Sequence, residues 1–196
     1  MLFRSGFERR AVHRREAGLG VHLCDRRLIG RSEHAIELAD LRHEVPGLHR
    51  ETDAERAAGI VLRASVQATG QACQSLERVY VHASLYDAFL ASLVRQARTV
   101  ELNYPDAHRG HIGPLIFARQ ADIIAEHLAE ALARGAVVHC GGEIEHYGGG
   151  CWIRPTVVTG VTHDMKLMTD ETFGPVIPVD RKSTRLNSSH MSESRM

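Results

Sequence analysis

The chain has 196 residues, of which 24 are basic and 24 acidic, so its formal net charge is zero. This length suits one domain or slightly more, and the balanced charge excludes an overall basic field that would attract nucleic acid or an anionic membrane. No apolar run approaches the roughly 18 to 20 residues that a membrane-spanning helix needs. We therefore expect no nucleic-acid partner and no membrane partner.

The cysteines at positions 24, 73, 140 and 151 form no Cys-x-x-Cys pair. This spacing argues against a zinc knuckle and against a thioredoxin-type redox site. Free thiols in a chain without a secretory signal are typical of a reducing compartment, so the sequence predicts a cytoplasmic protein.

Residues 1–52 are rich in arginine and histidine but show no sustained period of 3.6 or 2. A basic arm that binds nucleic acid is one interpretation, but no aromatic residue for base stacking follows Phe7 in this segment. We favour translation out of frame from a GC-rich coding region. Leu2–Ser5 and Asp180–His190 both resemble translated sequencing adapter, and we expect residues 180–196 to be a disordered tail.

Regular structure is predicted from Thr52 or Asp53, either of which can cap a helix that runs to Gly70. The expected apolar stripe of this helix consists of Ala57, Ala58, Ile60, Val61 and Ala64. The helix leads into Gly70–Ser75, where a turn relieved by glycine would present Cys73 just before a strand. A cysteine placed in this way can serve as a nucleophile. The alternative is that Cys73 is one more small buried hydrophobe.

A β-branched and aromatic run predicts a strand over Arg78–His82, and Ser84 is expected to cap a helix that ends near Val100. The inward face of this helix would carry Leu85, Phe89, Leu93 and Ala97. A break at Asn103–Asp106 follows. Strand, helix and break in succession indicate an α/β sheet.

A long helix is predicted from about Leu115 to Arg134, with Gly135 after its end. Its inward residues would be Ile116, Ile123, Ile124, Leu128, Ala131 and Leu132. A buried strand is expected at Val137–Cys140, and a glycine-bracketed loop is expected over residues 141–150. Further strands are expected at Arg154–Val158, with Pro155 at an edge or a strand start, and at the apolar run Val176–Val179. Cys140 and Cys151 would be buried and without a chemical role.

Thirteen histidines invite a metal hypothesis. No His-x-x-x-His pair lies on an expected helix face, and His108 and His111 share a glycine-containing loop with only Asp106 beside them. We therefore predict no metal site.

A series of short motifs follows in order along the chain. They are Gly70-Gln71-Ala72-Cys73, Glu77–Val81, Ile112-Gly113-Pro114, Gly141-Gly142, Arg154–Val157 and Asp170–Val176. Their order and spacing resemble those of the aldehyde dehydrogenase superfamily over residues 53–179. The resemblance implies an α/β fold, namely an incomplete three-layer αβα catalytic domain flanked by segments 1–52 and 180–196.

The resemblance also implies site residues and a reaction. Cys73 would be the catalytic nucleophile, while Glu171 would bind a cofactor ribose and Phe173 would pack beside the nicotinamide. An aldehyde would then be oxidised to a carboxylic acid with NAD or NADP, through a thiohemiacetal and a thioester of the cysteine. Thr172 departs from the family pattern, in which a branched aliphatic residue is usual. The general-base glutamate cannot be assigned, because Glu37 lacks the glycines of the family motif.

Two alternatives remain open at this point. One is a coenzyme-A-acylating aldehyde dehydrogenase, in which a thiol replaces water. The other is a non-catalytic interaction module that uses exposed edges of an incomplete sheet. For the dehydrogenase, we expect a small-molecule aldehyde as substrate, a homo-oligomer for the full-length protein, and little or no activity from this chain alone.

Overall fold

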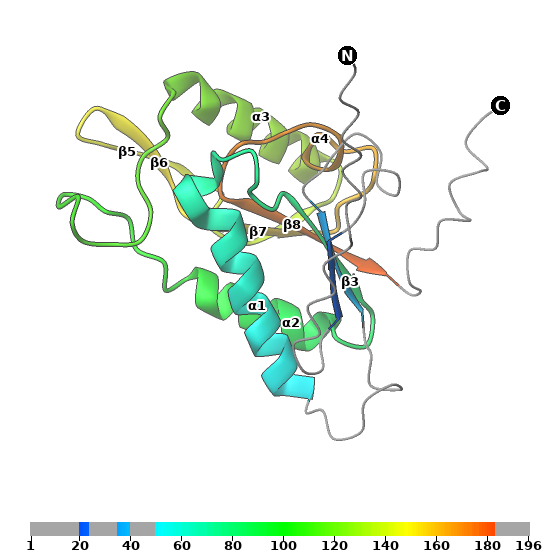
Figure 1. Cartoon of the computed structure of the whole chain (residues 1–196). Helices are drawn as coiled ribbons and strands as arrows, with labels where there is room; N and C mark the ends of the chain where they lie inside the picture. Colours follow the sequence, from blue (N-terminus) through cyan, green and yellow to red (C-terminus); the bar gives the residue numbers. More distant parts are fainter. Residues whose placement is uncertain (1–19, 24–34, 40–49, 183–196) are drawn as a thin grey trace, which may run out of the picture.

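The computed structural model describes residues 20–23, 35–39 and 50–182, and their elements lie in three layers (Figure 1). A six-stranded sheet has the strand order β1-β2-β3-β8-β7-β4. Helices α1 and α2 pack on one face of this sheet, and α3 and α4 pack on the other. The three-layer αβα arrangement implied by the resemblance is confirmed.

The inner strands of the sheet are parallel, while β1 and β4 join its two edges as antiparallel strands. The strands are β1 Gly20–Leu23, β2 Ala35–Ala39, β3 Arg78–His82, β4 Val137–Cys140, β7 Thr156–Thr159 and β8 Val176–Lys182. A separate hairpin consists of β5 Ile144–Tyr147 and β6 Gly150–Ile153. The helices are α1 Arg50–Val66, the 3₁₀ turn η1 Gln67–Gly70, α2 Tyr86–Ala97, α3 Ala118–Ala133 and α4 Lys166–Thr169.

Successive side chains of the central strands point to opposite faces of the sheet, so these strands contribute to a hydrophobic core on each face. Val79 and Val81 of β3 join the cluster under α1 and α2, whereas Tyr80 between them joins the cluster under α3 and α4. Strands that are covered on both faces carry apolar residues at nearly every position, as parallel strands of α/β proteins do.

The predicted helix after β3 is confirmed as α2, and its inward residues Leu85, Phe89, Leu93 and Ala97 are all buried. The predicted cap is wrong. The residue before the first helical position is Leu85, and the Ser84 hydroxyl instead lies 2.9 Å from Nδ1 of His82.

For α1 and α3, some of the residues predicted to face the core are exposed. α3 begins at Ala118 rather than Leu115, because Leu115 pairs with Cys151 in an isolated bridge and Phe117 has an extended backbone. Ile116 therefore precedes the helix and is 87% exposed. Leu132 at the end of α3 and Ile60 on α1 also face solvent.

Three predictions about the region around β4 are corrected. β4 is an edge strand, so Val137 is exposed rather than buried. The expected glycine loop is the β5–β6 hairpin, with Gly148 and Gly149 in its turn. Cys140 and Cys151 are half-buried rather than buried.

The structure extends beyond the limits expected for the ordered region. β1 and β2 lie in the segment for which no regular element was predicted, and β2 runs parallel to β3 with Glu37 in register with Tyr80. β8 continues past Val179 to Lys182, because it stays paired with β3 to its end. The expected disorder of residues 183–196 falls outside the described residues, and the adapter and reading-frame interpretations stay predictions.

No helix within the described ranges combines the length and the apolar character that crossing a membrane requires.

The segments that precede β3 and β8 meet where the amino ends of these two inner strands lie. Because β3 and β8 are parallel neighbours, with Val79 opposite Val179, the chain enters both strands from the same side. Gly70, in the turn before β3, lies against Gly174, in the loop before β8. A Cβ added to Gly70 would overlap the Gly174 carbonyl and would lie 2.7 Å from the nitrogen of Pro175. Gly70 also has a φ of +70°, so both its conformation and its contact require glycine.

We predict that Gly70→Ala lowers the free energy of unfolding by about 2 kcal/mol or more, because it adds a backbone clash to the strain of a positive φ. Gly149→Ala is the matched control. Gly149 has a φ of +81° but no atom within 4 Å of an added Cβ, so this change should cost only about 1 kcal/mol. Urea denaturation measures both values, and equal losses would show that the contact between the two loops adds nothing to stability.

Candidate active site

The cysteine turn leaves α1 through a strained 3₁₀ segment. Ala68 and Thr69 both have positive φ values, of 51° and 57°, and Gly70 follows in the same region. A positive φ is unusual for a β-branched residue and has to be compensated by the surroundings. The turn leaves Cys73 exposed, with its Sγ donating a 3.4 Å hydrogen bond to Oε1 of Gln74. Cys73 is thus not a small buried hydrophobe.

The loop after Ile112 holds this strained turn in place. The Thr69 hydroxyl donates to the carbonyl of Gly113 at 3.2 Å and accepts from the N–H of Gly113 at 3.1 Å. The Gln71 side chain accepts from the N–H of Ile116 at 2.8 Å and donates to the carbonyl of Pro114 at 3.4 Å. These contacts offset the strain at Thr69 and give the Ile-Gly-Pro motif a structural role.

Glu77 connects the cysteine turn to the loop before β8. Its Oε1 accepts hydrogen bonds from the backbone N–H groups of Thr172 and Phe173, each at 2.9 Å. The side chain is buried, with Glu77 only 6% exposed. Hydrogen bonds to a buried charged acceptor are stronger than neutral ones, so this carboxylate fixes the backbone of the loop.

Arg78 holds the end of α4 and the start of the same loop. Its Nε donates to the carbonyl of Met168 and its Nη2 donates to the carbonyl of Asp170, both at 2.8 Å. The guanidinium is fully buried, and burial lowers the pKa of Arg78, an effect that the nearby Glu77 carboxylate opposes. The two charges lie 3.9 Å apart, so each partly compensates the desolvation of the other.

Helix α3 holds the loop from the opposite side. The Gln120 side chain donates to the carbonyl of Thr172 at 2.7 Å. A hydrogen bond of 3.2 Å joins Nδ1 of His127 to Oγ1 of Thr172 in the buried layer between α3 and the loop. Burial lowers the pKa of His127 below its usual range.

The predicted site residues lie on the two segments that these contacts bring together. Cys73 is on the turn before β3, while Glu171 and Phe173 are on the loop before β8. Glu171 is exposed, and within residues 50–182 its carboxylate has no hydrogen-bond or salt-bridge partner. Phe173 is half-buried and has a φ of 45°. An unpaired carboxylate and an aromatic side chain two residues apart, on a loop whose backbone is anchored, fit a ligand with hydroxyl groups and a flat ring.

No role was predicted from the sequence for Glu77, Arg78, Gln71 or His127. A signal was present for two of these residues, because Arg78 opens β3, Glu77 directly precedes it, and the apolar run Val79–Val81 that follows indicates a buried setting. His127 falls among the inward residues Ile124, Leu128 and Ala131 of α3, which places a polar ring on an apolar stripe.

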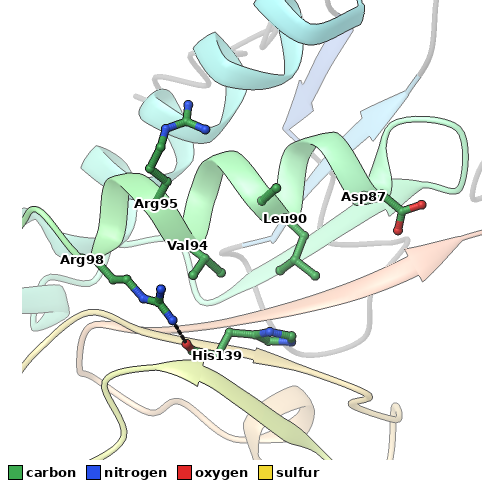
Figure 2. A pocket seen from close by; sticks show the side chains of 7 residues that line it. Asp87, Leu90, Val94, Arg95, Arg98 and His139 are labelled. Carbon is green, nitrogen blue, oxygen red and sulfur yellow. Dashed lines mark hydrogen bonds between the residues drawn. The ribbon is translucent and has the colours of Figure 1, made fainter.

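A hollow lies elsewhere, between the outer side of α2 and β4 (Figure 2). It is lined by Asp87, Leu90, Ala91, Val94, Arg95, Arg98 and His139. Arg98 donates to the carbonyl of His139 at 3.0 Å across it. None of the predicted site residues lines this hollow, and nothing in the described ranges groups three or more potential metal ligands.

Comparison with known proteins gives a family match over most of the chain. The model of the aldehyde dehydrogenase family matches residues 47–187. Succinate-semialdehyde dehydrogenase [NADP(+)] 1 of Mycobacterium ulcerans is 38% identical over 129 residues, which cover 66% of this chain and 28% of that protein. The chain therefore spans about 28% of the length of this relative.

Solved structures of the same family share the fold. Lactaldehyde dehydrogenase from Escherichia coli matches with a TM-score of 0.66 and 32% identity, over 74% of this chain and 30% of that one. The NAD+ complex of an aldehyde dehydrogenase from Bacillus cereus matches with a TM-score of 0.63 and 31% identity, over 68% of this chain and 27% of that one.

The motifs that resemble this family lie apart in the sequence but contact one another at the amino ends of β3, β7 and β8, and the family match covers them all. The chain belongs to the aldehyde dehydrogenase family.

Proposed function

We propose that this chain carries the nucleophile and part of the cofactor site of an NAD(P)-dependent aldehyde dehydrogenase. The observation that supports this most directly concerns Glu77, which follows Cys73 closely in the sequence. Its carboxylate accepts hydrogen bonds from the backbone N–H groups of Thr172 and Phe173. Glu77 therefore connects the segment that presents the exposed Cys73 thiol to the loop that presents the unpaired Glu171 carboxylate.

In this proposal the Sγ of Cys73 attacks the carbonyl carbon of the aldehyde and forms a thiohemiacetal. Backbone N–H groups of the turn donate to the oxyanion that develops on the substrate oxygen. The contacts of Thr69 and Gln71 with the Ile-Gly-Pro loop keep these donors in a fixed position. Such fixed donors lower the barrier because they need no reorganisation during the reaction.

Glu171 and Phe173 are the residues that would hold the cofactor. The Glu171 carboxylate can accept hydrogen bonds from ribose hydroxyls, and the Phe173 ring offers a flat apolar surface for a nicotinamide. When bound, the cofactor supplies the acceptor for the hydride of the thiohemiacetal. Glu77 and Arg78 act on these two residues indirectly, because they fix the loop backbone.

The names of the relatives support the class of substrate and of cofactor. The Mycobacterium relative is named for NADP+ and succinate semialdehyde, and the Bacillus structure contains NAD+. We therefore keep NAD or NADP as the cofactor and a small-molecule aldehyde as the substrate of the whole protein. The cytoplasmic location and the homo-oligomer expected from the sequence stay predictions.

Thiol labelling tests the nucleophile. In the 196-residue chain, iodoacetamide should alkylate Cys73 several times faster than Cys140, because Cys73 is exposed whereas burial raises the pKa of the Cys140 thiol. Adding NAD or NADP should change the rate at Cys73 and leave the rate at Cys140 unchanged. Mass spectrometry of tryptic peptides measures each site, with Cys73→Ser as the blank.

Equal slow labelling at Cys73, Cys140 and Cys151, with no effect of either cofactor, would contradict the dehydrogenase proposal and favour the non-catalytic interaction module.

A second experiment tests the role of Glu77. Glu77→Gln should lower the free energy of unfolding by about 2 to 3 kcal/mol, because a buried charged acceptor of two N–H groups is weakened and Arg78 loses its counter-charge. It should also abolish the effect of NAD or NADP on Cys73 labelling. Urea denaturation and the labelling assay provide the two readouts.

Glu55→Gln is the matched control, because Glu55 pairs with Arg95 on the surface and both side chains are largely exposed. Its cost should stay below about 1 kcal/mol. A Glu77→Gln protein with normal stability and a normal cofactor effect would show that this carboxylate does not hold the loop.

A further inference from the structure

Thr172 is a polar residue buried in the loop between the two proposed cofactor contacts, Glu171 and Phe173. It is 4% exposed. Its hydroxyl lies 3.2 Å from Nδ1 of His127, which is itself 6% exposed on the inward face of α3. Burying a hydroxyl or an imidazole costs free energy unless it forms a hydrogen bond, so each of these groups depends on the other.

Three side chains from two elements therefore determine the position of Thr172. Glu77, next to the start of β3, binds its N–H, Gln120 of α3 binds its carbonyl, and His127 of α3 binds its hydroxyl. The contacts of Glu77 and Gln120 reach only the backbone, so any residue at position 172 could make them. The contact of His127 requires a hydroxyl, so it is specific to threonine or serine.

We propose that His127 is a positioning residue which, through the Thr172 hydroxyl, holds the loop of Glu171 and Phe173 against α3. The role of this loop in cofactor binding rests on the function proposed above. The hydrogen bond itself can be tested without any cofactor.

The charged groups around His127 come from each element packed against it. They are Glu126 and Glu130 on α3, Lys166 on α4, Asp170 after α4, and Glu77 and Arg78 on the far side of the loop. Asp170, Glu126 and Glu130 favour the protonated ring, but burial is the largest effect and lowers the pKa of His127.

The sign of the pH effect follows from this shift. When the loop opens, His127 should return to its ordinary pKa of about 6.5. The open form then binds a proton more readily than the closed form, so protonation favours opening. The closed loop should keep its full stability above about pH 6.5 and lose stability as the pH falls below that value.

Amide hydrogen exchange of the 196-residue chain tests the proposal. The N–H groups of Thr172 and Phe173 report on the loop, because Glu77 binds both of them in the closed form. Without cofactor, their protection factors should be constant above about pH 6.5 and fall below it. His127→Leu should lower both protection factors about five- to tenfold at pH 7.5, because the hydroxyl loses its partner.

Conservative variants separate positioning from simple packing. His127→Asn keeps an amide near the position of Nδ1 but cannot titrate, so it should restore protection and remove the dependence on pH. His108→Asn, at an exposed histidine, should behave as the unchanged chain. The amide of Phe89 in α2 should be unaffected in each case, since it reports global unfolding. If His127→Leu fails to fold, Thr172→Val removes the same hydrogen bond from the other side.

Retention of the pH dependence in His127→Asn, or normal protection in both His127→Leu and Thr172→Val, would overturn the proposal. These outcomes are independent of the dehydrogenase function, because the exchange experiment contains no cofactor. A chain that passes the exchange test but shows no effect of NAD or NADP on Cys73 would retain the role of His127 and lose the proposed reaction.

Discussion

The buried carboxylate of Glu77 is the interaction on which the candidate site depends. It accepts two backbone N–H groups from a loop that is remote in the sequence, and Arg78 binds two carbonyls of the same segment. Neither residue needs to touch a substrate. Together they fix the backbone of the segment that carries Glu171 and Phe173, and Gly70 of the cysteine turn lies against Gly174 of the same segment.

This arrangement lies at the amino ends of β3 and β8, whereas ligands of open α/β sheets usually bind outside the carboxyl ends. The reason is topological. The cysteine turn and the loop of Phe173 both lead into their strands, so parallel pairing brings these segments together at the amino ends. Loops at this edge lack the following helix that often orients a ligand at the other edge. Side-chain anchors such as Glu77, Gln71 and Gln120 supply the rigidity instead.

Local patterns predicted much of the fold, because they depend on nearby residues. The stripe of α2 with Phe89 and Leu93 followed from helical periodicity, whereas the limits of α3 did not, because Leu115 pairs with a hairpin far along the chain. Cys73, Glu171 and Phe173 were singled out through resemblance to a family. The anchoring role of Glu77 was not predicted, because it depends on a partner 95 residues away and a charged residue in isolation resembles a solvated one.

That separation along the chain also affects how the protein folds. A contact between residues so distant in sequence closes a large loop, and such contacts form only after their entropic cost has been met by other pairings. α1, the cysteine turn, β3 and α2 all precede the segment around Thr172 in the chain, and α1 can pack on α2 before that segment has been synthesised. The thiol would thus exist on a partly folded chain well before the loop of Glu171 and Phe173 is present to pack against the cysteine turn.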